Sequence, residues 1–170
     1  MRKRGASSSL LSRQASPDAP VNRSIAVESR QVAFDNVCKR ILAELKAHSF
    51  NEDDTFAVHL ALDEAFVNAV EHGNKMDPTK KVKIEYSVDS DKVEISITDE
   101  GNGFDVDSVA DPRLGSGLDE TSGRGLLLMN SYMDTVKFNE PGNSVYMVRC
   151  KEKPDVTKGH SETKCLSSTS

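Results

Sequence analysis

The order of its predicted elements places this sequence in the α/β class, as a two-layer sandwich whose mostly antiparallel mixed sheet carries helices on one face. Strand-like segments come in adjacent pairs, which favours antiparallel hairpins over strands that alternate singly with helices. Two helix-like segments precede the first pair, and a third helix-like segment separates the two pairs.

Composition divides the chain into one domain and two tails. The 170 residues are 36% hydrophobic and 29% charged, which is ordinary for a folded protein. Residues 1–23 are rich in serine, arginine and proline and predict a disordered basic tail, and residues 151–170 predict a second, polar and mobile tail. The domain between them, residues 24–150, is long enough to bury a core.

The net charge of −5 conceals an acidic domain between basic ends. Residues 24–150 hold 13 basic and 23 acidic residues, a net charge of −10. Such a surface is unsuited to direct nucleic-acid binding, because phosphate contacts need positive charge, and it suits a basic protein partner better. No apolar run reaches the roughly 18 residues of a membrane span, and the basic start lacks a signal-peptide core. Three widely spaced cysteines without CxxC spacing favour a reducing cytoplasm.

The first two elements are a short strand and an amphipathic helix. Residues 24–28 alternate apolar and polar side chains, as a strand with one buried face does. Ser29 is the expected N-cap of a helix that runs to about His48. The buried face of this helix is expected to hold Val32, Val37, Ile41, Leu42 and Leu45.

The second helix runs from an expected N-cap at Asn51 to a stop at Gly73, and it carries unusual polar residues. Set into one face of this mostly apolar helix are Glu64, Asn68 and either Glu71 or His72. Asparagine is a poor residue inside a helix, because its amide competes for backbone hydrogen bonds. The polar line is therefore either a solvated edge or a site for a metal and a proton transfer, and helical spacing alone does not decide between them.

The remaining elements are two hairpins, a long loop and a third helix. Residues 82–97 alternate apolar and polar side chains on both sides of a central turn, as a hairpin does. Residues 135–150 are expected to form a second hairpin around the turn Glu140-Pro-Gly-Asn143. The loop, residues 105–122, is dominated by Asp, Gly and Ser, and a segment of this length is typical of a lid or binding loop. A glycine-led helix, residues 123–133, follows it.

Two short glycine motifs could contact a ligand. Asp99 ends a strand and leads into Gly101 and Gly103; a carboxylate there can accept a hydrogen bond from an amino group, while glycine lets the backbone approach a flat ligand. Gly123 and Gly125 open a helix, whose free N–H groups suit an anion. Each motif alone is weak, because glycine is common in ordinary turns and loops.

Together, three ordered motifs resemble the nucleotide site of the GHKL superfamily of ATPases, which share the Bergerat fold. The motifs are Asp63-Glu-Ala-Phe-Val-Asn-Ala-Val-Glu-His-Gly73, Asp99-Glu-Gly-Asn-Gly-Phe104 and Gly123-Arg-Gly-Leu-Leu-Leu-Met129. Within this superfamily the chain is most similar to the small anti-sigma factor serine/threonine kinases. The similarity spans about residues 24–150 and neither tail.

The resemblance implies an ATP-binding site. Asn68 would hold Mg²⁺ through its side-chain oxygen, a hard ligand for a hard cation. Asp99 would accept a hydrogen bond from the adenine amino group, and Gly101 and Gly103 would make room for the ring. The start of a phosphate-binding helix would be formed by Gly123, Arg124 and Gly125. The side chain between the two glycines faces either the phosphates or solvent.

The resemblance also implies phosphoryl transfer. Glu64 would be the general base that takes the proton from a substrate hydroxyl, and one helical turn, about 6 Å, separates it from Asn68. Arg113 in the loop is a further candidate for phosphate contact. His72 either joins the site or pairs with the helix dipole, and Glu71 is expected to be solvated or salt-bridged.

The implied function is that of a cytoplasmic Mg·ATP-dependent protein serine kinase acting as an anti-sigma regulatory factor. It would bind a sigma factor and phosphorylate a serine of an antagonist protein. The alternative is a non-catalytic module of the same fold that binds a protein partner under the control of ATP; Glu64 weighs against it, since a pure binder needs no base. A third hypothesis is a serine kinase domain whose output is not transcription. The oligomeric state stays open, with a homodimer as one option.

Overall fold

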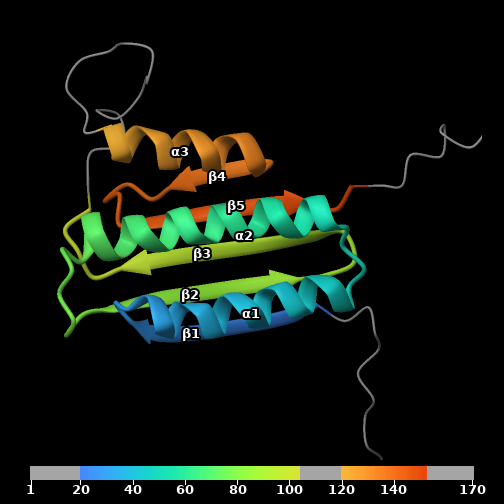
Figure 1. Ribbon diagram of the computed structural model, residues 1–170, viewed down its shortest axis with the longest axis horizontal. Helices are drawn as coiled ribbons and strands as arrows, with labels where there is room; N and C mark the ends of the chain where they lie inside the picture. The colour runs from blue at the N-terminus through green and yellow to red at the C-terminus, as the bar shows by residue number, and fades with distance from the viewer. Residues whose placement is uncertain (1–19, 104–119, 153–170) are drawn as a thin grey trace, which may run out of the picture.

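The computed structural model describes residues 20–103 and 120–152 of the chain. Its elements, in chain order, are β1 (Val21–Glu28), α1 (Gln31–Ala47), α2 (Glu52–Val67), the π-helical turn η1 (Asn68–Gly73), β2 (Lys81–Val88), β3 (Lys92–Asp99), α3 (Glu120–Tyr132), β4 (Thr135–Phe138) and β5 (Ser144–Cys150). The five strands form one sheet in the order β1-β2-β3-β5-β4, and every neighbouring pair among them is antiparallel. Helices α1 and α2 cover one face, and α3 lies next to β4 (Figure 1). The predicted two-layer α/β sandwich is confirmed.

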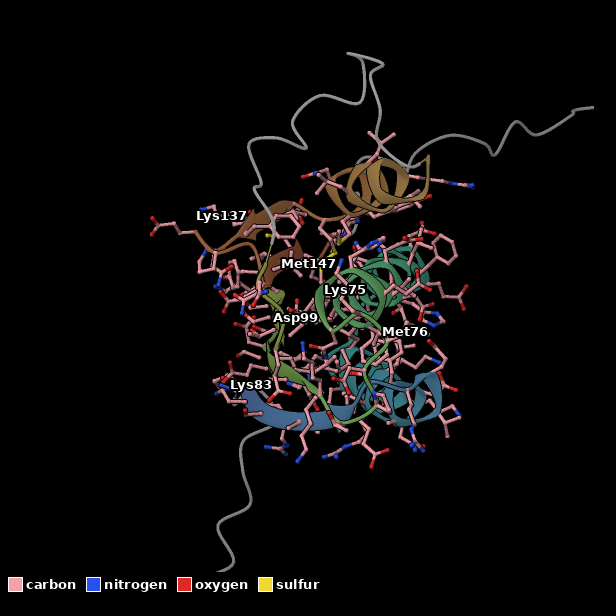
Figure 2. All side chains as sticks on the ribbon, turned by 90° about the vertical axis from the view of Figure 1, so that its left-hand side faces the viewer. Lys75, Met76, Lys83, Asp99, Lys137 and Met147 are labelled. Carbon is pink, nitrogen blue, oxygen red and sulfur yellow. The ribbon has the colours of Figure 1, made fainter. Side chains whose placement is uncertain are left out.

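The core lies between the sheet and helices α1 and α2. Every second side chain of β2 is buried, and Lys83 lies on the side of the sheet away from the helices, whereas Met147 lies between the layers (Figure 2). Phe34 of α1 and Phe66 of α2 stack with ring centroids 4.3 Å apart. Such a pair contributes about 0.5–1.5 kcal/mol beyond its buried area. This packing fixes α2 over the sheet, and so fixes the end of the helix relative to the end of β3.

Strand β1 begins three residues earlier than the sequence predicted. Val21 lies opposite Val88, and Arg23 lies opposite Tyr86, so residues 21–23 pair in the sheet although they were assigned to the basic tail. Backbone pairing at a sheet edge needs no apolar side chain, which is why these mostly polar residues carried no strand signal.

Helix α1 corrects two predictions. Ser29 is not its N-cap: Arg30 holds that position without a side-chain bond, and the Ser29 hydroxyl donates instead to the Lys80 carbonyl at 3.0 Å. Val32 is 75% exposed, because the stripe that faces the core lies on another side of the helix. The buried residues of α1 are Phe34, Val37, Cys38, Ile41 and Leu45, with Leu42 partly buried.

Helix α2 begins as predicted and changes its bonding near its end. The Asn51 side chain accepts a hydrogen bond from the Asp54 N–H at 2.6 Å, which confirms the N-cap. The residues Asn68–Gly73 form a π-helical turn, in which each N–H bonds to the carbonyl five residues earlier. The Asn74 N–H follows the same pattern and donates to the Ala69 carbonyl at 2.8 Å. A π turn rotates the side chains that follow it and is frequent at functional sites.

Helix α3 begins at Glu120, so the predicted glycine-led start is wrong. Gly123 completes the first turn of the helix, and Gly125 lies in the second. Glycine costs about 1 kcal/mol inside a helix relative to alanine but does not end one, so glycines do not mark where this helix starts. Both predicted hairpins are present as β2–β3 and β4–β5. Most of the predicted loop, residues 105–122, lies outside the described residues.

The last described residues are tied to the start of α2. The Nε and Nη2 atoms of Arg149 each lie 2.8 Å from Oδ1 of the fully buried Asp54. The Glu152 N–H donates to Oδ2 of the same carboxylate at 3.0 Å. Residue 152, although assigned to the C-terminal tail, is therefore anchored to the domain. None of the described helices has the length and apolar character needed to cross a membrane.

Candidate functional site

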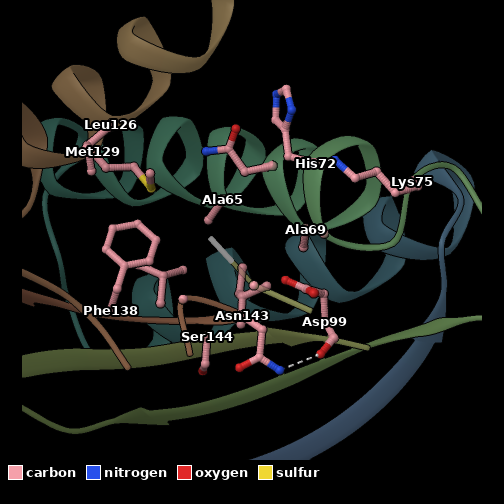
Figure 3. Close-up of a pocket in the computed structure, with 16 residues that line it drawn as sticks. Ala65, Ala69, His72, Lys75, Asp99, Leu126, Met129, Phe138, Asn143 and Ser144 are labelled. Atoms are coloured by element: carbon pink, nitrogen blue, oxygen red, sulfur yellow. Dashed lines mark hydrogen bonds between the residues drawn. The ribbon is translucent and has the colours of Figure 1, made fainter. Parts of the chain in front are cut away.

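A cavity of about 260 Å³ lies between the end of α2, the sheet and helix α3 (Figure 3). Its apolar walls are formed by Ala65, Ala69, Ile97, Leu126, Met129, Phe138 and Val145. Its polar lining side chains are Asn68, His72, Lys75, Asp99, Asn143 and Ser144. Apolar walls with a few polar groups are typical of a small-molecule site. The structure thus brings the predicted residues Asn68 and Asp99 to one cavity.

Asp99, the last residue of β3, presents its carboxyl group to this cavity (Figure 3). Its Oδ1 accepts a hydrogen bond from the Gly101 N–H at 2.7 Å. The Asp99 N–H donates to the Asn143 carbonyl at 3.0 Å, and the Asn143 side chain donates back to the Asp99 carbonyl at 3.2 Å. Burial raises the pKa of the Asp99 carboxyl, while the bond from Gly101 opposes the rise. The result is a fixed acceptor in a largely apolar cavity, suited to an amino group on a flat ligand.

Glycines let the chain close tightly around this carboxyl group. A Cβ at position 73 would overlap the carboxyl atoms of Asp99, and a Cβ at position 101 would overlap the Gly73 carbonyl. Gly103 has a φ of +73°, and a Cβ there would overlap the Pro141 carbonyl. At these glycines, other parts of the chain fill the space that a side chain would occupy. The sequence prediction was that Gly101 and Gly103 make room for the adenine ring. Gly103 lines the cavity.

Glu64 and Asn68 lie together where α2 meets α3. A Cβ at Gly125 would lie 2.7 Å from Oε2 of Glu64 and 3.4 Å from Nδ2 of Asn68. The glycine at position 125 therefore lets the backbone of α3 approach both polar side chains. Both residues are half-buried, so the polar line on α2 is partly covered by α3 and is not an open, solvated edge. Asn68 lines the cavity, whereas Glu64 lies just outside its lining.

The other predicted residues are now placed. Glu71 and His72 are both exposed, and of the two only His72 lines the cavity. Arg124 is exposed, which agrees with the alternative in which its side chain faces solvent. Gly123 lies inside α3, and Arg113 lies outside the described residues.

Three polar lining residues were not predicted from the sequence: Lys75, Asn143 and Ser144. Lys75 and Met76 have φ values of +56° and +59°, which are uncommon for residues that carry a side chain. This turn directs Lys75 to the edge of the cavity (Figure 3). The position of Lys75, two residues after Gly73, was a usable signal. Asn143 and Ser144 belong to a hairpin whose local sequence is that of an ordinary turn.

The donor atoms at the site suit a magnesium ion that is shared with a phosphate ligand. Within residues 20–103 and 120–152, no group of three or more His, Cys, Asp or Glu side chains could hold a metal ion. The Glu64 carboxylate, near the end of α2, and the Asn68 amide, at the start of the π turn, do offer hard oxygen donors four residues apart. Mg²⁺ is commonly held by one or two protein ligands and completed by water and substrate phosphates. The residues present therefore fit a magnesium nucleotide.

Comparison with known proteins agrees with this arrangement. Residues 27–149 match the histidine kinase-like ATPase domain. The chain belongs to this family. The matched region contains Glu64, Asn68 and Asp99, and membership implies that this histidine kinase-like domain binds ATP.

Two named relatives show which members of this family the chain is similar to. The chain is 35% identical to an anti-sigma F factor of Oceanobacillus iheyensis over an alignment of 102 positions that covers 57% of this chain and 70% of the relative. It is 32% identical to the serine-protein kinase RsbW of Bacillus licheniformis over an alignment of 120 positions that covers 65% of this chain and 73% of the relative. These relatives confirm the resemblance to anti-sigma factors and serine kinases.

A solved structure confirms the fold. The crystal structure of the RsbU and RsbW domains of Rv1364c from Mycobacterium tuberculosis matches with a TM-score of 0.54 and 16% sequence identity. The match covers 78% of this chain and 33% of that chain. At this level of identity the likeness concerns the fold alone.

Proposed function

We propose that the chain is a cytoplasmic Mg·ATP-dependent protein serine kinase of the anti-sigma type, which binds a sigma factor and phosphorylates a serine of an antagonist protein. One observation carries the proposal. Glu64 and Asn68 meet Gly125 beside a cavity that reaches the half-buried carboxyl group of Asp99. In this proposal a base, a metal ligand and an acceptor for a nucleobase share one site. The names of the relatives support the choice of partners.

Each residue has a distinct role in this proposal. ATP and Mg²⁺ supply the phosphoryl group and neutralise its charge during transfer. Asp99 accepts a hydrogen bond from the adenine amino group within the apolar cavity. Asn68 offers its amide oxygen to the metal. Glu64 accepts the proton of the attacking serine hydroxyl. Gly125 lets the backbone of α3 approach these groups closely.

A second candidate is a non-catalytic module that binds a protein partner under the control of ATP. The position of Glu64 favours it, because this side chain packs against Gly125 and lies outside the cavity lining. A carboxylate that only supports α3 would show the same geometry. The two candidates therefore share the nucleotide site and differ in the role of Glu64.

Phosphorylation of a partner tests the proposal. The parent protein and Asn68→Ala are incubated with γ-labelled ATP and a lysate of the source cells, and the labelled protein is identified by mass spectrometry. We expect the parent to label one protein on serine and Asn68→Ala to label none. Glu71→Ala is the matched control, since Glu71 is exposed on the same π turn, and it should label as the parent does. A parent protein that binds ATP but labels nothing would favour the second candidate.

A further inference from the structure

Asn74, the residue directly after the π turn, is fully buried, and both polar atoms of its side chain are hydrogen-bonded. Its Nδ2 donates to the Ser29 hydroxyl at 2.8 Å and to the Lys81 carbonyl at 3.0 Å. Its Oδ1 accepts a hydrogen bond from the Glu100 N–H at 2.8 Å. A single side chain thus joins the start of α1, the start of β2 and the end of β3.

The bond to Glu100 acts on the backbone next to Asp99. Glu100 follows Asp99 directly, and its own carboxylate accepts the Lys81 N–H at 2.7 Å. On the helix side, the Asn74 N–H donates to the Ala69 carbonyl at 2.8 Å. Asn74 therefore links the end of the helix to the end of the strand, and these two ends carry opposite sides of the cavity.

The end of the π turn packs tightly against the end of β3. There is no room for a Cβ between Gly73 and the carboxyl group of Asp99, so a small shift of the strand end must move that carboxyl group. Buried polar networks in which every atom is bonded hold their members rigidly. We propose that Asn74 is a positioning residue, which fixes the carboxyl group of Asp99 in the cavity and thereby sets selectivity for adenine. This inference rests on the proposed nucleotide site.

A role in stability alone makes a different prediction. If Asn74 only holds the fold together, its loss weakens the binding of every nucleotide equally. If it positions Asp99, its loss weakens binding only where the base carries an amino group for Asp99 to accept from. Inosine triphosphate separates the two cases, because it has a carbonyl oxygen where adenine has the amino group.

The experiment measures the affinities of ATP and inosine triphosphate, with Mg²⁺, by calorimetry in the parent, Asn74→Ala and Ser29→Ala. The preference for ATP over inosine triphosphate should fall about tenfold in Asn74→Ala, the equivalent of one hydrogen bond. Ser29→Ala removes a bond from the same network but leaves the bond between Asn74 and Glu100. It should therefore keep the parental preference. In an Asp99→Asn background, Asn74→Ala should change the preference no further.

Circular dichroism checks the folding of each variant, and Asn74→Ser replaces Asn74→Ala if the latter does not fold. A folded Asn74 variant with the parental preference would overturn the inference. If neither variant folds, Asn74 determines the fold and not the site, which also overturns it. A parent protein that binds neither nucleotide would contradict the proposed function itself, and that result is distinct from the other two.

Discussion

Replacing Gly73 by alanine should remove Asp99 from the cavity without changing Asp99 itself. The added Cβ would overlap the carboxyl atoms of Asp99. Gly73 does not have a positive φ, so alanine fits the backbone and gains about 1 kcal/mol of helix propensity. The carboxyl group must turn away, which costs about 0.5–1.5 kcal/mol for a strained rotamer. It also loses the bond from Gly101, worth about 1.5–3 kcal/mol for a charged acceptor.

These terms predict a variant that folds, is about 1–3 kcal/mol less stable than the parent, and binds Mg·ATP on the order of 10- to 100-fold more weakly. Denaturant unfolding measures the stability, and calorimetric titration measures the affinity. Glu71→Ala, an exposed substitution on the same π turn, should change neither. If Gly73→Ala binds Mg·ATP as tightly as the parent, Asp99 does not contact the nucleotide and the assignment of the cavity is wrong.

Three further predictions concern charge and burial. Asp54→Asn should destabilise the fold by about 3–5 kcal/mol in denaturant unfolding, because it leaves the guanidinium of Arg149 without its buried counter-charge; a loss below 1 kcal/mol would refute this. Burial raises the folded-state pKa of Asp99 above its ordinary value of 3.8. The folded protein therefore loses stability as the pH rises from 3.8 through the raised pKa, because the half-buried carboxyl group must ionise. ATP affinity should fall as the pH drops through the raised pKa, because the carboxyl group becomes protonated. Titrations across pH should show this step in the parent and not in Asp99→Asn. Burial raises the pKa of the Cys38 thiol to about 12, so iodoacetamide at pH 8 should alkylate the exposed Cys150 and spare Cys38 until the protein is unfolded, as peptide mapping would show; equal labelling would contradict the burial.

Local patterns were sufficient for most of the fold. Strict alternation in residues 82–97 predicted the β2–β3 hairpin, because one face of that hairpin is buried against helices. Asn51 was a correct N-cap, because its side chain can satisfy a backbone donor three residues away. The motifs that contain Asn68 and Asp99 come from distant segments, yet both residues line one cavity.

Tertiary contacts account for what the sequence did not reveal. Ser29 had the residue type of a cap, but its hydroxyl bonds to Asn74 and to Lys80, which lie far away in the sequence. The π turn depends on how the end of α2 meets β3, and no local pattern predicts it. The π turn ends at Gly73, as the sequence predicted. No local pattern revealed the second role of this glycine, whose missing side chain makes room for Asp99.

The central claim is that this site transfers phosphate. Its most direct test is the single-turnover rate at which Glu64→Gln transfers phosphate, at saturating Mg·ATP, to the partner protein identified by labelling with γ-labelled ATP. Glutamine keeps the shape of the side chain but cannot take the proton of a serine hydroxyl. The account predicts transfer about 10²–10⁴-fold slower than in the parent, with nucleotide affinity and melting temperature nearly unchanged. Transfer at the parental rate would contradict the role of Glu64 as the base.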